Sequence, residues 1–146
     1  MSEVKQVIVW RNDIKVRKGK FASQIAHASL GAVLKMMKKK MVLEQVQTEC
    51  GQYVPVMKGK YLLEFEKNSF LDNWLNGRFT KICVSCDNEE QLLSLYNEAA
   101  SKNIPTVLIT DAGLTEFHGV ATNTCIAIGP YWSEEIDKIT RHLKLL

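Results

Sequence analysis

The chain has little of the residues that mark fibrous or disordered proteins. Its 146 residues include only 3 Pro and 8 Gly, while 46% of them are hydrophobic. Collagen-like repeats need far more Gly and Pro, and disordered segments cannot supply this much apolar side chain. We therefore expect one compact domain over residues 1–146, with a hydrophobic core of its own.

Long hydrophobic runs are also missing. No stretch approaches the roughly 20 apolar residues that a membrane-spanning helix needs. The first residues lack the order of charged, apolar and small residues that signal peptides have. We expect a cytoplasmic protein that does not enter a membrane.

Cysteine is scarce, with only four in the chain. In a protein without an export signal, reduced thiols are expected rather than disulfides. Cys83 and Cys86 have the spacing of a redox motif or of half a zinc site, but no second Cys or His pair follows at finger spacing. They also fall in an expected strand, where residues three apart face opposite sides. We expect no metal, and a zinc or redox protein is one rival hypothesis.

Charge is unevenly distributed along the chain. Residues 1–60 hold 12 Lys or Arg against 4 acids, whereas residues 61–146 hold 7 against 12. A basic amino-terminal half suits a polyanionic partner such as a nucleic acid. A solvated Lys-rich helix end at Lys38–Lys40 would produce the same count without binding anything, so the asymmetry alone leaves both interpretations open.

Hydrophobic periodicity predicts alternating strands and helices. Continuous apolar runs predict buried strands, and apolar residues at helical spacing predict helices, one of them capped by Asn68 or Ser69 and another opened by the capping-box pattern of residues 87–90. The expected strands cover residues 7–10, 81–86, 107–109 and 124–128, and the expected helices cover residues 21–39, 70–75, 87–103 and a final one from 133 onward.

Strands separated by helices indicate an α/β fold. We expect a three-layer sandwich with a mixed sheet of about four strands and helices on both faces. Residues 39–62 show neither the helical nor the strand period of apolar residues, because Gly51, Pro55 and Gly59 interrupt the pattern. We expect an irregular insertion there.

The start of the long helix carries an unfavourable cluster of cations. Lys15, Arg17, Lys18 and Lys20 lie where exposed amides and the helix dipole already supply positive charge. Gly19 adds backbone freedom, so that an anion could approach the main-chain N–H groups. The pattern favours an anion site, although a solvated basic loop would look the same.

A carboxylate follows the expected strand at residues 107–109. Asp111-Ala112-Gly113-Leu114-Thr115 comes directly after it, and ligands in open α/β folds gather at the carboxyl ends of strands. The segment is a candidate site, although Asp-Ala-Gly is also a common turn in which the Asp bonds its own backbone.

Several ordered motifs resemble type 2 peptidyl-tRNA hydrolases over residues 4–38 and 68–146. They are Arg11-x-Asp13-x-Lys15-x-x-Lys18-Gly19-Lys20-x-Ala22-x-Gln24-x-x-His27-Ala28, then Pro105-Thr106, Ile109-x-Asp111-Ala112-Gly113-x-Thr115, Ala127-Ile128-Gly129-Pro130 and the ending from Ile136 to Leu145.

The resemblance implies hydrolysis of the ester bond between a peptide and tRNA, which releases free tRNA for reuse. It implies no cofactor and no metal, a peptidyl-tRNA substrate and a homodimer. It places the functional lysine on Lys20, the aspartate on Asp111 and the threonines on Thr115 and Thr124. Gln24 and His27 match the helix motif, and Gly113 matches the Asp-Ala-Gly turn; the resemblance implies that these three residues, with Gly19, bind the substrate.

Ester hydrolysis suggests roles for these residues. Water that attacks a carbonyl needs a proton acceptor, and positive charge is needed where the oxyanion develops. We expect Asp111 to hold the water, directly or through Thr115, and Lys20 to stabilise the oxyanion or the leaving oxygen. The basic residues Arg11, Arg17 and Lys18 would contact tRNA phosphates. His27 lies on an otherwise apolar helix face, where packing is the more common role of a histidine.

Three departures from the family pattern leave a second hypothesis open. Leu114 stands where Arg is usual, Glu116 stands where Gln is usual, and the loop to Thr124 is one residue longer. The alternative is a non-catalytic module that binds RNA or protein on the same fold. Residues 39–62 are an additional stretch, which is either a surface insertion or an added RNA contact.

Overall fold

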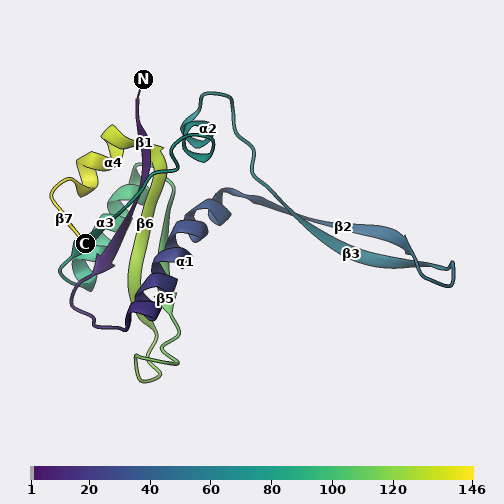
Figure 1. Ribbon diagram of the computed structural model, residues 1–146, viewed down its shortest axis with the longest axis horizontal. Coiled ribbons are helices and arrows are strands. Elements are labelled where there is room, and N and C mark those ends of the chain that lie inside the picture. The colour runs from purple at the N-terminus through teal and green to yellow at the C-terminus, as the bar shows by residue number, and fades with distance from the viewer. Residues whose placement is uncertain (1) are drawn as a thin grey trace.

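A computed structural model describes residues 2–146, and it has the α/β architecture expected from the sequence (Figure 1). A five-stranded mixed sheet has the order β5-β6-β1-β4-β7, and a separate two-stranded sheet joins β2 to β3. The strands are β1 (Val4–Arg11), β2 (Lys38–Gln47), β3 (Tyr53–Leu62), β4 (Lys81–Cys86), β5 (Thr106–Asp111), β6 (Thr122–Trp132) and β7 (Lys144–Leu145), and the helices are α1 (Lys18–Met36), α2 (Phe70–Leu75), α3 (Glu89–Ser101) and α4 (Ser133–Thr140).

Strand directions decide which ends meet at one edge of the sheet. β1 and β4 are parallel, whereas β6 runs antiparallel to both β1 and β5. β1, β4 and β5 therefore point the same way, and their carboxyl ends share one edge. This is also the edge where α1 and β6 begin.

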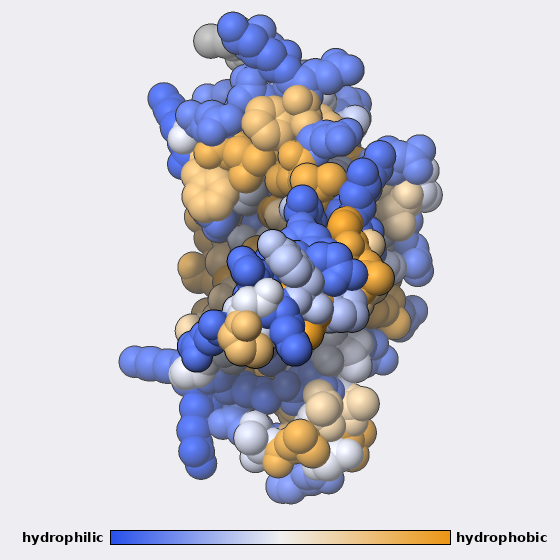
Figure 2. Space-filling model, turned by 90° about the vertical axis from the view of Figure 1, so that its right-hand side faces the viewer, coloured by the Kyte–Doolittle hydropathy of each residue, from blue (hydrophilic) through white to orange (hydrophobic). Residues whose placement is uncertain are grey.

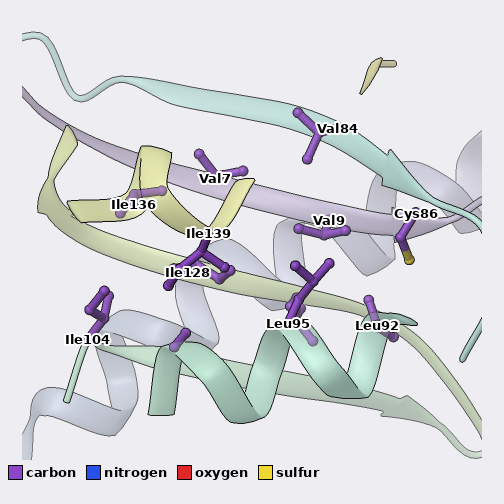
Figure 3. Packing of buried hydrophobic residues seen from close by; sticks show 12 residues of the cluster. Val7, Val9, Val84, Cys86, Leu92, Leu95, Ile104, Ile128, Ile136 and Ile139 are labelled. Atoms are coloured by element: carbon purple, nitrogen blue, oxygen red, sulfur yellow. The ribbon is translucent and has the colours of Figure 1, made fainter. Parts of the chain in front are cut away.

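Two layers of helix cover the sheet. On one face, α1 buries Ala28 and Ala32 against Ile8, Trp10 and Ala127. On the other face, α3 and α4 bury their apolar side chains against the alternate residues of the same strands. Figure 3 shows this second cluster, with Leu92 and Leu95 of α3 and Ile136 and Ile139 of α4 pointing towards Val7, Val9 and Ile128. The three-layer sandwich is confirmed.

Local sequence signals explain most element boundaries. The Ser69 hydroxyl accepts a hydrogen bond from the Asp72 N–H at the start of α2, and the Asn88 side chain accepts one from the Gln91 N–H at the start of α3. Such caps satisfy amides that a helix leaves unbonded. The expected strand at residues 81–86 is confirmed with those bounds.

The ends of α1 and the number of strands in the main sheet differ from the prediction. α1 begins at Lys18 rather than near residue 21, and it ends at Met36, because Lys38 and Lys39 already belong to β2. β7 was not expected, since two residues carry no periodic pattern; it pairs with β4 at the sheet's edge.

The segment expected to be irregular is a regular β-hairpin. β2 and β3 pair over ten residues each, from Lys38 opposite Leu62 to Gln47 opposite Tyr53. Figure 1 shows this hairpin projecting away from the rest of the molecule beyond the end of α1. Because neither of its faces packs on the core, its residues lack the alternation of buried and exposed positions that identifies a strand in sequence.

The cysteines lie as their strand positions predict. Cys83 packs on the α1 face of the sheet and Cys86 on the α3 face. All four are free thiols. Burial raises the pKa of Cys86 to about 11 and that of Cys125 to about 12, so these thiols stay protonated near neutral pH. No helix within residues 2–146 is long and apolar enough to cross a membrane.

Candidate active site

Lys20 and Asp111 meet at the edge where the parallel strands end. Asp111 is the last residue of β5, and Lys20 lies in the first turn of α1. The Lys20 Nζ atom is 2.7 Å from Oδ1 of Asp111 and 3.1 Å from Oγ1 of Thr115. Both side chains of the ion pair are mostly covered, with 16% and 13% of their surface exposed. The structure thus joins three of the four residues expected to be catalytic.

Thr124, the fourth, lies beneath this pair and reaches it through Gln24. The Thr124 hydroxyl donates to Oε1 of Gln24 over 2.6 Å, and Nε2 of Gln24 donates to Oδ1 of Asp111 over 3.2 Å. Thr124 is fully buried and Gln24 is 2% exposed. Neither side chain opens to solvent, so their position suits orienting Asp111 rather than touching a substrate.

Gly113 holds the other oxygen of the carboxylate. Its backbone N–H donates to Oδ2 of Asp111 over 2.8 Å. Gly113 has a φ of +79°, and a Cβ atom there would lie 2.1 Å from the carbonyl oxygen of Val120. Only glycine fits this turn. Because Gly113 is buried, it supports Asp111 from below rather than contacting a ligand directly.

These bonds keep Asp111 ionised. The hydrogen bond from Lys20 lowers the pKa of the carboxyl group most, and the Gly113 N–H, the Lys20 charge and Gln24 lower it further, against the opposing effect of burial. A carboxylate can accept about four hydrogen bonds and an ammonium group can donate three. Asp111 accepts three here and Lys20 donates two. Each group therefore has capacity for one more bond.

The start of α1 has no capping side chain and no acid in its first turn. Lys18 and Gly19 are exposed there, and a Cβ atom on Gly19 would meet nothing within 4 Å. The Arg17 side chain is 92% exposed, and its Nε atom lies 3.5 Å from a carboxylate oxygen of Glu116. Exposed amides, the helix dipole and these cations together attract an anion. An open cleft lined by Lys15, Val16, Arg17, Thr115 and Glu116 adjoins this helix start.

Arg11, unlike Arg17 and Lys18, is largely buried and already hydrogen-bonded. Its guanidinium donates to both oxygens of Asp13, to Glu89 and to the carbonyl of Asn123. Four of its five N–H donors are thereby taken up, and only 12% of the side chain is exposed. A phosphate could reach only the remaining donor, so this geometry suits joining the ends of β1, α3 and β6.

His27 lies elsewhere than the sequence suggested. It is exposed on α1, whereas its apolar neighbours in the sequence predict a histidine packed in the core. The helix turns it towards solvent about two turns beyond Lys20, on nearly the same side of α1. That correction removes a packing role and leaves the side chain free to meet a ligand.

Three contacts could not have been found from the sequence. Glu89 and Asn123 bond to Arg11 from segments remote in the chain, and the ring of Phe117 lies 5.9 Å from the Lys20 Nζ atom. Glu116 reaches the start of α1, where its carboxylate accepts from the Arg17 backbone N–H over 3.3 Å. For this last contact, the sequence offers one signal, which is an acidic residue in the loop after Asp111.

The site combines the Lys20–Asp111 ion pair, the hydroxyl group of Thr115 and the uncapped amides at the start of α1. An α/β protein with these groups is equipped for acid–base chemistry at an ester, amide or phosphate. Within residues 2–146 no group of three or more His, Cys, Asp or Glu side chains is placed to hold a metal ion.

Comparison with known proteins identifies the family. The family model described as "Peptidyl-tRNA hydrolase PTH2" matches residues 4–146. A peptidyl-tRNA hydrolase from Methanopyrus kandleri is 37% identical over 142 residues, covering 97% of each chain. Another from Thermococcus onnurineus is 37% identical over 146 residues, covering all of both chains. One from Staphylothermus marinus is 38% identical over 145 residues, covering 99% of this chain and 97% of the relative. The chain belongs to the peptidyl-tRNA hydrolase PTH2 family.

Proposed function

We propose that this chain hydrolyses the ester bond between a peptide and the terminal ribose of tRNA, with Lys20, Asp111 and Thr115 at the reacting centre. The products are a free peptide and a tRNA that can be charged again. One observation supports this assignment. Lys20 Nζ and Asp111 Oδ1 lie 2.7 Å apart, and each group can still form one more hydrogen bond.

Ester hydrolysis needs one acceptor and one donor at the carbonyl carbon. The fourth acceptor position of Asp111 holds the attacking water, and the third N–H of Lys20 faces the oxygen on which negative charge develops. Since its pKa is lowered, Asp111 is a weak base. It orients the water and keeps Lys20 charged, and it takes the proton only as the carbon–oxygen bond forms.

Thr115 is the exposed partner of the pair. Its oxygen accepts a hydrogen bond from Lys20 over 3.1 Å, so its own O–H remains able to donate to the substrate or to the water. Gln24, Gly113 and Thr124 keep Asp111 in place from the buried side. They are positioning residues.

Binding of the tRNA end falls to the exposed groups of α1. Arg17 and Lys18, with the main chain at Gly19, receive phosphates near the ester, and His27 meets the nucleotide chain farther along the helix. Arg11 contributes by fixing the ends of the strands. Attraction between these cations and phosphates weakens as salt rises. We also propose a cytoplasmic location and a homodimer, in keeping with the family.

The test is to change each member of the central pair separately. Asp111→Asn keeps the shape but removes the charge, and Lys20→Met removes the donor. Each should lower kcat on N-acetyl-aminoacyl-tRNA by about a hundredfold or more, measured as release of the acyl group. The control is Lys138→Met, which breaks a surface pair with Glu135 of similar length, 2.9 Å, and should leave turnover unchanged.

Near-normal turnover by both site variants would contradict the mechanism. The alternative, a non-catalytic RNA- or protein-binding module, is not favoured by the family match or by the relatives named as hydrolases. Single-turnover cleavage with excess enzyme distinguishes the two, because a binding module would leave the ester intact at any enzyme concentration.

A further inference from the structure

The β2–β3 hairpin carries a basic face that the stability of the hairpin does not explain. Residues opposite one another in an antiparallel pair share a face, as do alternate residues of one strand. The register sets Lys40 opposite Lys60 and Lys58 opposite Val42. Lys38, Lys40, Lys58 and Lys60 therefore lie on one face, in the half of the hairpin next to α1.

This arrangement is unfavourable for the hairpin alone. Like charges directly opposite each other destabilise a strand pair, and Lys is a poor strand former. Only Lys58 has a carboxylate partner, Glu44, at 2.9 Å. Within residues 2–146 no ion pair forms at Lys38, Lys40 or Lys60. Among the residues that the structure describes, these three neighbouring cations thus form no ion pair, and Glu44, which pairs with Lys58, is the carboxylate whose pKa Lys60 also lowers.

The hairpin also stands clear of the body. All residues of β3 are exposed, and Figure 1 shows the two strands leaving the molecule beyond the last turn of α1. In Figure 2 the hairpin is seen end-on, with hydrophilic side chains gathered beside hydrophobic ones. Its other face carries exposed Met41, Leu43 and Met57.

The distance from the active site suits a large substrate. α1 has 19 residues, which corresponds to a length of roughly 28 Å from one end to the other. Lys20 lies at one end and Lys38 follows the other. A polyanion bound at both ends must extend well beyond the ester, as the body of a tRNA does.

We propose that the Lys38, Lys40 and Lys60 face of the hairpin is a second binding surface, which contacts phosphates of the tRNA body away from the ester. This inference rests on the proposed function for its ligand. Charge complementarity carries it: three unpaired cations on a projecting arm face a substrate with one phosphate per nucleotide. Such contacts bind without reading sequence.

The experiment compares two variants with equal loss of charge. The arm variant combines Lys38→Gln, Lys40→Gln and Lys60→Gln. The control combines Lys67→Gln, Lys102→Gln and Lys144→Gln, which are exposed and off the hairpin. We measure kcat and KM on N-acetyl-aminoacyl-tRNA, and binding of deacylated tRNA by fluorescence anisotropy, each at several salt concentrations.

The arm variant should raise KM and the tRNA Kd roughly tenfold or more at low salt and leave kcat unchanged. It should also make the plot of log Kd against log salt shallower by roughly two to three. The control should change both constants far less. An unchanged KM and Kd in the arm variant, or equal effects in the control, would overturn the inference.

Failure of the proposed function gives a different result, because the unaltered chain would then not cleave the ester while binding of deacylated tRNA could still depend on the arm. A protein role for the hairpin is separable as well. It predicts that Leu43→Ser with Met57→Ser changes the mass measured by light scattering while the lysine variant leaves tRNA affinity intact, which would overturn the RNA contact.

Discussion

Gln24 connects the buried and exposed halves of the site. Its amide oxygen accepts from Thr124, so its nitrogen must face Asp111 and donate to it. An amide can otherwise turn over and present its oxygen to the carboxylate, where it would repel rather than bind. The Asp111 carboxylate, which can only accept, therefore sets the orientation of Gln24, and the buried Thr124 hydroxyl holds the amide in that orientation by donating to its oxygen.

Thr124→Val tests this positioning role. Valine has the same shape without the hydroxyl, so Gln24 loses its donor and Asp111 its fixed partner. We expect kcat to fall roughly ten- to a hundredfold with little change in KM, and the free energy of unfolding to drop by about 1–3 kcal/mol. Thr124→Ser, which keeps the donor, should restore kcat. A loss of stability with kcat intact would show that Thr124 serves the core alone.

α1 performs two tasks at its ends. Its first turn faces the site without a cap, and its last turn leads into the hairpin. Helix starts usually gain stability from a capping side chain and an acid in the first turn. α1 has neither of these. Carboxylates reach its start from outside, where Glu116 accepts from the Arg17 N–H and Asp111 pairs with Lys20. An open helix start of this kind sacrifices stability for access.

The Gly19→Ala variant measures how much stability the open helix start loses. Alanine is favoured over glycine within a helix by up to about 1 kcal/mol, and the added methyl group would meet nothing within 4 Å. Unfolding should therefore require more denaturant, while KM for the tRNA ester rises because the methyl group stands where a phosphate approaches the amides.

Gly31→Ala is the matched control on the same helix, where the methyl group would contact Val107 at 3.5 Å, away from the site. It should leave KM unchanged. Equal KM values in both alanine variants would argue against an anion at Gly19.

Regular elements with a buried face could be predicted from the sequence, and those without one could not. The strand at residues 81–86 and the helix at residues 70–75 have apolar patterns set by the core, and both are confirmed. The hairpin has no core face, and Gly51, Pro55 and Gly59 looked like breaks. Gly51 does make the turn, with a φ of +85°, whereas Pro55 and Gly59 lie within β3.

The residues of the site also differ in how far the sequence predicts them. Motif resemblance placed Lys20, Asp111 and Thr115 together, and the geometry brings them within hydrogen-bonding distance. Their catalytic roles stay predictions. The bonds of Arg11 to Glu89 and Asn123 depend on segments that only folding brings together, so its burial and saturation could not be predicted from local sequence.

Acid should destabilise the whole molecule through this same sheet edge. Lys20 lowers the pKa of Asp111, and Arg11 lowers the pKa of Asp13. A carboxyl group whose pKa is lower in the folded state adds stability at pH values above its unfolded pKa of about 4. That stability disappears as the pH falls through the folded pKa.

Urea unfolding between pH 7 and pH 3 measures the effect. The midpoint should fall with acid, and it should fall less in Asp111→Asn, which has no proton to gain at that position. Parallel curves for the two proteins would show that Asp111 contributes nothing to the pH dependence.

The projecting hairpin also separates the charges of the molecule in space. Residues 61–146 have five more acids than bases, which would weaken the positive field of a compact basic patch. Lys40, Lys58 and Lys60 stand about 7–14 Å along the hairpin from its base, comparable with or beyond the screening length of about 8 Å at physiological ionic strength. An approaching polyanion would meet these lysines, together with Glu44 beside Lys58, before it reaches the acids of residues 61–146. The shape of the arm should therefore speed the first encounter with tRNA, in addition to strengthening the bound complex.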